Sequence, residues 1–182
     1  MAQIIIVGDG PGGLSAAVFL ARGGHDVTVF GLDKTAVNYA RLNNYLGLLP
    51  IDGPDFQAIA RGQATTAGAT LRSELVTEVS TSDRIDATTE GGETVAGDYL
   101  ILSEGKNPVL ARSLGLQENE AGAIEVDRDY KSSHDRVYVV GRSARPTRSQ
   151  AIISAGAGAT AASDILAREA GKDVQDWDSI SN

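Results

Sequence analysis

The chain of 182 residues has a mass of 18.9 kDa, which is the size of a single domain. It contains no cysteine, which excludes a disulfide scaffold, a zinc-thiolate site and a dithiol redox centre of its own. The formal net charge of -8 argues against a nucleic-acid or anionic-membrane partner, and neither a membrane span nor a signal peptide is evident, so we expect a cytoplasmic protein.

The first thirty residues predict one βαβ unit. Residues 4–7 form a continuous β-branched run, typical of a strand buried on both faces. A glycine-rich break follows, then a helix over residues 14–22 that Gly23-Gly24 ends, then a second strand over residues 27–30. We expect the crossover between the two strands to be right-handed.

The middle of the chain is less regular. Residues 35–41 have no clear pattern, and residues 43–47 predict an ordered loop. The turn residues 52–55 open a helix over residues 56–67, with Asp55 near its cap. The later predicted elements are a strand over 70–79, a hairpin of 85–89 and 93–96, a buried strand over 99–102, one or two helical turns over 109–114, a buried strand over 137–140 and a long helix over 149–168.

These elements predict one α/β domain over residues 1–172, with a parallel sheet, flanking helices and a small antiparallel β layer. The long C-terminal helix is rich in Gly and Ala, which favours close packing. A polar tail over residues 173–182 follows, and it contains the single tryptophan, Trp177. The 24 Asp and Glu residues outnumber the four Lys residues sixfold, which suits a salt-rich cytoplasm. A mildly acidic mesophilic protein is the open alternative.

The main motif is Gly8-x-Gly10-x-x-Gly13, which follows a strand and opens a helix. Gly8 would permit the tight turn, Gly10 would let the backbone approach a pyrophosphate, and Gly13 would let helix and strand pack closely. The amides of the helix N-terminus suit phosphate groups. A tight turn without a ligand is the alternative, and Asp9 must turn away from a pyrophosphate.

An acidic residue that binds the ribose is expected at the end of the second strand, about 20 residues after the glycines. Phe30 and Gly31 stand there, so Asp33 is the nearest candidate. A capped turn explains Asp33 equally well. Two separated histidines without cysteine give no metal site.

Several segments together resemble the FAD-binding domain of the thioredoxin reductases, within the two-dinucleotide-domain flavoproteins. They are Gly8 to Ala17, Phe30 to Lys34, Asn43 to Gly47, Gly53-Pro54-Asp55, Asp98 to Gly105 with Asn107-Pro108, and Val137 to Gly141 with Gln150-Ala151-Ile152. The resemblance implies FAD as cofactor, favours Asp33 as ribose ligand, and implies a homodimer.

The departures from this family are specific. Its NADPH domain, with a redox Cys-x-x-Cys, is inserted in the middle of the FAD domain, and residues 105–125 leave no room for it. Thr35-Ala36-Val37 replaces a Gly-Gly-Gln, Ser103-Glu104-Gly105 replaces Ala-Thr-Gly, and Arg142 replaces the Asp of Gly-Asp. Thioredoxin reductase activity is therefore excluded for this chain as it stands.

The sequence thus predicts a small FAD-binding oxidoreductase or electron-transfer protein that uses an external electron donor. A non-catalytic module that binds FAD or ADP for sensing or assembly is the alternative. No catalytic acid or base can be named. The candidate cofactor-binding residues are Gly8, Gly10, Pro11, Gly12, Gly13, Gly31, Leu32, Asp33, Lys34, Asn44, Val76, Ser103, Glu104, Gly105, Gly141, Arg142, Gln150 and Ala151.

Overall fold

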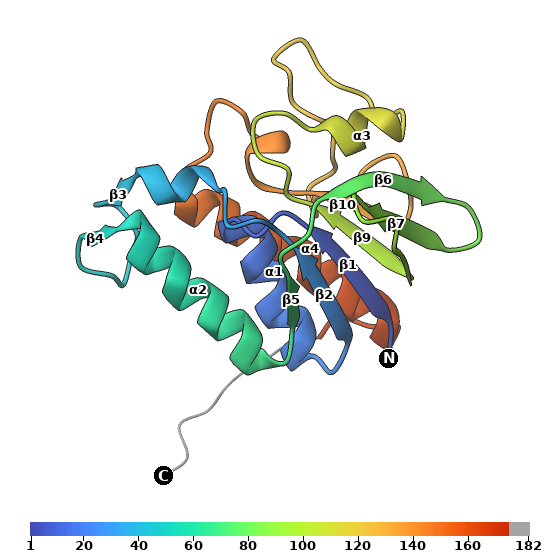
Figure 1. The fold of residues 1–182 in the computed structure, drawn as a ribbon, viewed down its shortest axis with the longest axis horizontal. Coiled ribbons are helices and arrows are strands. Elements are labelled where there is room, and N and C mark those ends of the chain that lie inside the picture. Colours follow the sequence, from blue (N-terminus) through green and yellow to red (C-terminus); the bar gives the residue numbers. More distant parts are fainter. Residues whose placement is uncertain (175–182) are drawn as a thin grey trace.

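A five-stranded parallel sheet forms the centre of the protein, whose computed structural model describes residues 1–174. The strand order is β10-β9-β1-β2-β5, so the first strand lies in the middle. Helices cover one face, and a small antiparallel sheet covers part of the other (Figure 1). The strands are β1 (Gln3–Val7), β2 (Asp26–Phe30), β5 (Thr70–Arg72), β9 (Tyr99–Leu102) and β10 (Val137–Val139). The predicted fold class is therefore confirmed.

The β-branched run of β1 is buried on both faces because each face has its own cover. Ile4 and Ile6 point toward the helices, whereas Ile5 and Val7 point toward the antiparallel layer. All four residues are less than a tenth exposed. The two covered faces explain why the apolar residues of β1 are consecutive in the sequence instead of alternating with polar ones.

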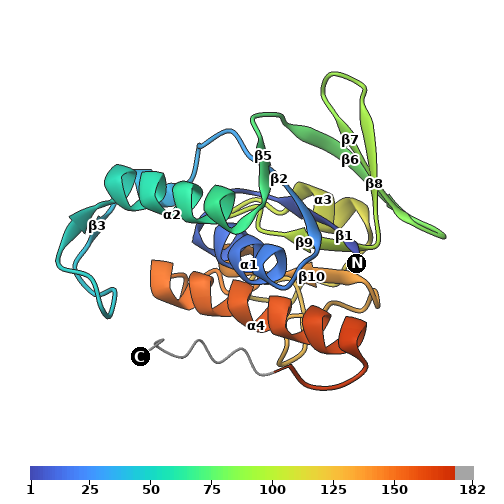
Figure 2. The same ribbon diagram turned by 90° about the horizontal axis from the view of Figure 1, so that it is seen from below.

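Three helices pack on one face of the sheet (Figure 2). They are α1 (Pro11–Arg22), α2 (Gly53–Ala67) and α4 (Ala151–Ala170). Helices α1 and α4 approach closely where Gly158 meets Gly12, because a Cβ on Gly158 would lie 1.9 Å from the carbonyl oxygen of Gly12. The small residues of α4 therefore serve packing inside the chain. None of the helices within residues 1–174 has the length and hydropathy needed to cross a membrane.

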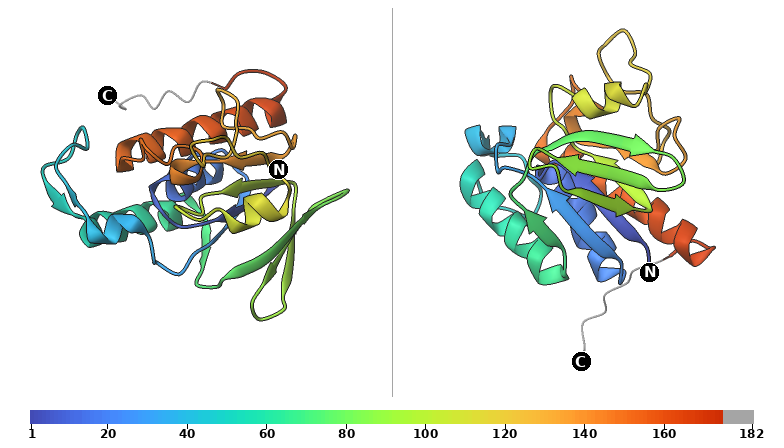
Figure 3. Two further views of the ribbon diagram at one scale, coloured as in Figure 1. Left: turned by 90° about the horizontal axis from the view of Figure 1, so that it is seen from above. Right: turned by 45° about the vertical axis from the view of Figure 1, so that its right-hand side comes forward.

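The remaining elements stand on the other side of the sheet and at its carboxyl edge. The antiparallel sheet has the order β6-β7-β8, and a separate two-stranded pair, β3-β4, projects from the body near the start of α2 (Figure 3). The bounds are η1 (Ala36–Tyr39), β3 (Arg41–Leu42), β4 (Ile51–Asp52), β6 (Val76–Thr81), β7 (Ile85–Thr89), β8 (Thr94–Gly97), α3 (Val109–Ser113) and η2 (Gly141–Ser143).

Two local predictions differ from the structure, and a third, the loop over residues 43–47, agrees with it. The strand expected over residues 70–79 is two strands, because β5 pairs in the parallel sheet and β6 in the antiparallel one. Helix α2 begins at Gly53 with Asp52 as N-cap, so Asp55 lies in the first turn. Residues 43–47 lie in the connection between β3 and β4, where the sequence predicted an ordered loop.

The domain boundary at residue 172 is not tested by the fold. Helix α4 ends at Ala170, and Gly171 follows it in the left-handed conformation. The predicted tail falls mostly on residues 175–182, including Trp177, which lie outside the described residues.

Candidate functional site

A cavity of about 940 Å³ opens at the carboxyl ends of the central parallel strands. Its floor includes Val7 at the end of β1 and Phe30 at the end of β2, and Ser103 follows β9. The N-termini of α1 and α4 both reach it, through Pro11 and Ala151. Crevices in this place are where open α/β sheets bind their ligands.

Most of the candidate residues line this cavity. Sixteen of the eighteen do so: Gly8, Gly10, Pro11, Gly12, Gly31, Leu32, Lys34, Asn44, Val76, Ser103, Glu104, Gly105, Gly141, Arg142, Gln150 and Ala151. Gly13 and Asp33 do not. Segments spread over 143 positions of sequence, from Gly8 to Ala151, are thus brought together at one end of the sheet.

The glycines of the first loop have two distinct roles. A Cβ on Gly8, where φ is +104°, would lie 2.1 Å from the carbonyl oxygen of Ser103. A Cβ on Gly13 would lie 2.0 Å from the carbonyl oxygen of Gly8. Both positions therefore need glycine for the fold itself.

Gly10 is different, because the protein leaves room for a side chain there. A Cβ on Gly10 would touch only the side chain of Thr35, with its Oγ1 at 3.0 Å. Gly10 is the N-cap of α1 and offers no side-chain cap, so the first amides of the helix have no capping oxygen from it. This geometry leaves the helix end open to a ligand with anionic oxygens.

Asp9 turns away from the mouth of the helix and is almost fully buried. Its carboxylate forms an ion pair with Arg61 and accepts a hydrogen bond from the backbone N–H of Asp33 at 3.0 Å. A Cβ on Gly31 would lie 2.3 Å from the carboxylate carbon of Asp9, so Gly31 makes room for it. The predicted orientation of Asp9 is what the structure shows.

Asp33 is held in a turn beside the cavity and is not among the residues that line it. It adopts a left-handed conformation with φ of 56°, and its carboxylate accepts a hydrogen bond from the Asn38 amide at 3.3 Å. These constraints hold the exposed side chain outside the cavity lining. The turn interpretation of Asp33 fits this geometry, and its neighbours Leu32 and Lys34 line the cavity instead.

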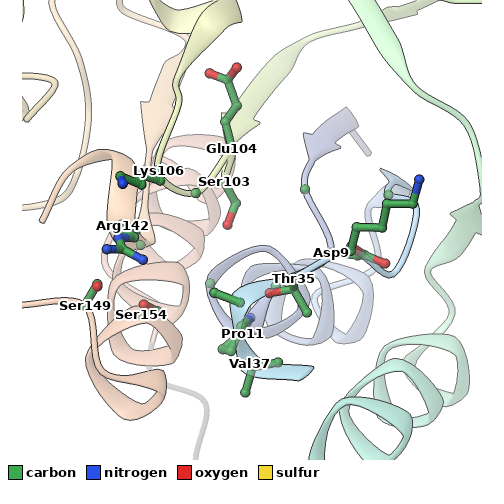
Figure 4. A pocket seen from close by; sticks show the side chains of 18 of the residues that line it. Asp9, Pro11, Thr35, Val37, Ser103, Glu104, Lys106, Arg142, Ser149 and Ser154 are labelled. Carbon is green, nitrogen blue, oxygen red and sulfur yellow. The ribbon is translucent and has the colours of Figure 1, made fainter. Parts of the chain in front are cut away.

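Glu104 lines the cavity, but its carboxylate is engaged elsewhere. It accepts hydrogen bonds from the backbone N–H groups of Leu110 and Ala111 at 2.7 and 3.0 Å. Burial raises the pKa of this carboxyl group, against the opposing effect of those hydrogen bonds. Figure 4 shows the side chain extending away from Pro11 and Thr35. Glu104 thus ties the end of β9 to α3.

Arg142 is the most informative side chain of the cavity. Its Nε atom is buried and has no hydrogen-bond partner among the described residues. Lys106 lines the same cavity, and Figure 4 shows both side chains on the wall opposite Pro11. A buried guanidinium nitrogen without a partner is costly unless a ligand oxygen completes it.

The cavity fits a dinucleotide on these observations. It has the volume of a small-molecule site, an open place above Gly10, and an orphaned donor on Arg142. Part of its lining is apolar and exposed, which a ring system would cover: Leu32, Tyr39, Leu75 and Val109. Within residues 1–174, no group of three or more metal-binding side chains is present.

Sequence reasoning missed many of the lining residues, among them Thr35, Val37 and Lys106. Thr35 and Val37 were assigned to a segment that loses a contact, yet both line the cavity beside the glycine loop. Lys106 had no pattern to mark it, because a single lysine after a strand is common on surfaces.

The fold and the cavity together define a dinucleotide-binding α/β domain. The pyridine nucleotide-disulphide oxidoreductase family matches residues 2–46 and 45–160, and the chain belongs to that family. This family consists of FAD-dependent flavoproteins, and the chain corresponds to the FAD-binding domain of its thioredoxin reductases.

Curated relatives are similar over part of their length. The thioredoxin reductase of Spironucleus barkhanus is 35% identical over 147 residues, which are 76% of this chain and 48% of the relative. The thioredoxin reductase of Mycolicibacterium smegmatis is 32% identical over 123 residues, which are 65% of this chain and 39% of the relative. The chain therefore spans about half the length of the curated relatives it matches, or less.

Solved structures share the fold at low identity. The thioredoxin reductase of Gloeobacter violaceus has a TM-score of 0.90 at 15% identity and covers 98% of this chain and 99% of its own. The atypical thioredoxin reductase TRi of Desulfovibrio vulgaris Hildenborough has a TM-score of 0.83 at 18% identity. The match covers 93% of this chain and 99% of the TRi chain. In the present structure, residues 103–136 between β9 and β10 contain α3 and loops, so no second domain is inserted there.

Proposed function

We propose that this chain is an FAD-binding redox domain that receives electrons from a donor outside the chain. The single observation on which the proposal rests is the space at Gly10, the N-cap of α1. The protein leaves space there at an uncapped helix N-terminus, inside a cavity that the other candidate residues line. A pyrophosphate at this helix N-terminus would accept hydrogen bonds from the free amides of the first turn.

The cavity residues divide between the two ends of a bound dinucleotide. The amides after Gly10 would bind the pyrophosphate, because they lie at the positive end of α1. Gly31, Leu32, Lys34 and Val76 would contact the adenosine end, since the ribose-binding position follows the second strand. The other end would lie against Asn44, Ser103, Gly105, Gly141, Arg142, Gln150 and Ala151. Bound FAD would supply the electron transfer itself.

The electron donor must come from elsewhere because the chain has no means of its own to reduce FAD. There is no cysteine in the 182 residues, and no nicotinamide-binding domain stands between β9 and β10. Exposed side chains at the cavity, such as Tyr39 at 91% exposure, leave an approach for a diffusing reductant or a partner protein.

The visible absorption spectrum of the purified protein tests this proposal. We expect a yellow protein whose flavin bands are bleached by dithionite and restored by air. A colourless protein that gains these bands on incubation with FAD would also support it. A colourless protein that binds ADP and not FAD would overturn it in favour of a nucleotide-binding module. A protein that binds neither would refute dinucleotide binding altogether.

A further inference from the structure

We propose that Lys106 and Arg142 form a cationic site that binds the reduced, anionic form of the flavin more tightly than the oxidised form. This inference rests on the proposed function, because it needs FAD in the cavity. It assigns to these two residues a control of the reduction potential that the amides of the glycine loop cannot exert.

The strand order places the two cations at the flavin end. In the sheet β10-β9-β1-β2-β5, the glycine loop follows the central strand β1. The adenosine end lies beyond β2, on one side of that loop. The other half of the dinucleotide must then extend over β9 and β10, where Lys106 and Arg142 follow the strand ends.

The charges at that end have no acidic partner among the described residues. Neither Lys106 nor Arg142 forms an ion pair within residues 1–174, although the chain carries a net charge of -8. The nearby Glu104 carboxylate binds the amides at the start of α3. Two uncompensated cations in one cavity of an acidic protein favour an anionic ligand group.

Oxidised flavin is neutral in its ring, whereas the two-electron reduced ring can carry a negative charge. A nearby cation stabilises the second state more than the first, so it raises the reduction potential in addition to any hydrogen bond that it donates to oxidised FAD. The N-terminus of α4, twenty residues long and uncapped by a side chain, acts in the same direction. The pyrophosphate is equally charged in both states, so contacts to it do not affect the potential.

The test compares the midpoint potentials of the FAD-loaded wild type, Arg142→Gln, Lys106→Gln and the double variant. Lys34→Gln is the matched control, because Lys34 lines the same cavity on the adenosine side. We expect the ratio of the affinities for reduced and oxidised flavin to fall at least tenfold in the double variant. For a two-electron couple that change lowers the potential by about 30 mV.

The outcomes separate this inference from the proposed function. A lowered potential in Arg142→Gln and Lys106→Gln, with Lys34→Gln unchanged, supports the inference. Potentials equal to the wild type in FAD-loaded variants would overturn it and leave FAD binding intact. An equal shift in Lys34→Gln would overturn it too, because a general charge effect would then suffice. Failure of the wild type to bind FAD would refute the proposed function itself.

Discussion

At the scale of single residues, the glycine motif combines two physical requirements, the geometry of the fold and the approach of a ligand. Gly8 and Gly13 are needed because backbone atoms occupy the space of a side chain. At Gly10 a Cβ would meet no backbone atom, only the side chain of Thr35, whose Oγ1 would lie 3.0 Å away. The distinction matters because only the second kind of glycine can be replaced without loss of the fold.

Gly10→Val should abolish FAD binding while the protein stays folded, because the valine side chain occupies the place of the pyrophosphate. We expect the dissociation constant to rise more than a hundredfold and the free energy of unfolding to fall by about 1 kcal/mol or less, as the side chain meets only Thr35. Titration with FAD, followed by flavin fluorescence, measures the first and urea unfolding the second. Gly62→Ala on the exposed face of α2 is the control and should bind as the wild type does. Full FAD occupancy in Gly10→Val would show that the phosphates bind elsewhere.

Arg142→Ala should weaken the binding of oxidised FAD by about tenfold to a hundredfold. A charge-assisted hydrogen bond contributes roughly 1.5–3 kcal/mol, and about 1.4 kcal/mol is a factor of ten. The buried, unpartnered Nε atom is the reason to expect such a bond. Titrating FAD into both apo proteins decides the matter. Equal dissociation constants would remove this role, and tighter binding by the variant would mean that Arg142 obstructs the site.

The candidate site could be predicted from sequence where residue type and chain position together have a physical meaning. The glycines after a strand, and the ends of β9 and β10, were of this kind. The conformation of Asp33 could not be predicted, because its left-handed φ and its hydrogen bond with Asn38 depend on the fold around it. Lys106 was missed because it is an exposed lysine in a loop, and nothing in the sequence marks such a lysine as part of a cavity lining.

At the scale of elements, the contact between α1 and α4 supports the cavity, since both helix N-termini reach it. The close approach depends on Gly158 against Gly12. The predicted elements matched the structure best where burial is complete, as in β1, β9 and β10. They matched least over residues 35–52, where short strands and a turn of 3-10 helix depend on packing against α2.

Two glycines of α4 should respond oppositely to alanine. Gly156→Ala should stabilise the protein by roughly 0.5–1 kcal/mol, because the position is open and alanine lowers the entropy cost of the helix. Gly158→Ala should destabilise it by roughly 1–3 kcal/mol or more, because its Cβ would meet the Gly12 carbonyl. Urea unfolding of the two variants and the wild type measures both. Equal stabilities of the two variants would mean that the helices are further apart than described.

The link between β10 and α4 should weaken in acid. The Tyr138 hydroxyl donates to Asp164 at 2.5 Å, and Arg168 donates to the same carboxylate at 2.7 Å. Burial alone raises the pKa of Asp164, but these two hydrogen bonds outweigh it and hold the pKa below its ordinary value. A carboxyl group with a lowered pKa stabilises the fold above its unfolded pKa of about 3.9, and the stabilisation is lost as pH falls through the folded pKa.

Asp164→Asn should therefore be less stable than the wild type at pH 7, and the difference should shrink below about pH 4. Thermal unfolding of both proteins between pH 7 and pH 3 measures it. Asp55→Asn, in the exposed first turn of α2, is the control. A stability difference that does not change with pH would contradict the assignment of this pKa to the Tyr138 contact.

At the scale of the whole molecule, the largest exposed apolar side chains gather around the β3-β4 pair. Tyr39, Leu46 and Leu49 are each nearly nine-tenths exposed or more, and the pair projects from the body (Figure 3). Exposed apolar groups of this size favour association. The close packing that the sequence predicted for the small residues of α4 occurs within the chain, where Gly158 meets Gly12 of α1.

We predict a homodimer that buries Leu46 and Leu49 of this projection, which lie outside the cavity lining. Light scattering at micromolar concentration, in low and in high salt, should give twice the mass of the chain. Leu46→Asp with Leu49→Asp should yield monomers, because charges at an apolar interface are costly to bury. Glu78→Asp on the exposed strand β6 is the control. A monomeric wild type in both salt conditions would contradict the dimer.

The central claim is that the cavity holds FAD with its phosphates at α1 and its flavin over β9 and β10. A crystal structure of the protein grown with FAD tests this most directly. The account predicts the pyrophosphate against the amides after Gly10, the adenosine beside Lys34, and the flavin ring beside Lys106 and Arg142. A well-ordered protein with an empty cavity, or a dinucleotide bound in the reverse direction with its flavin beside Lys34, would contradict it.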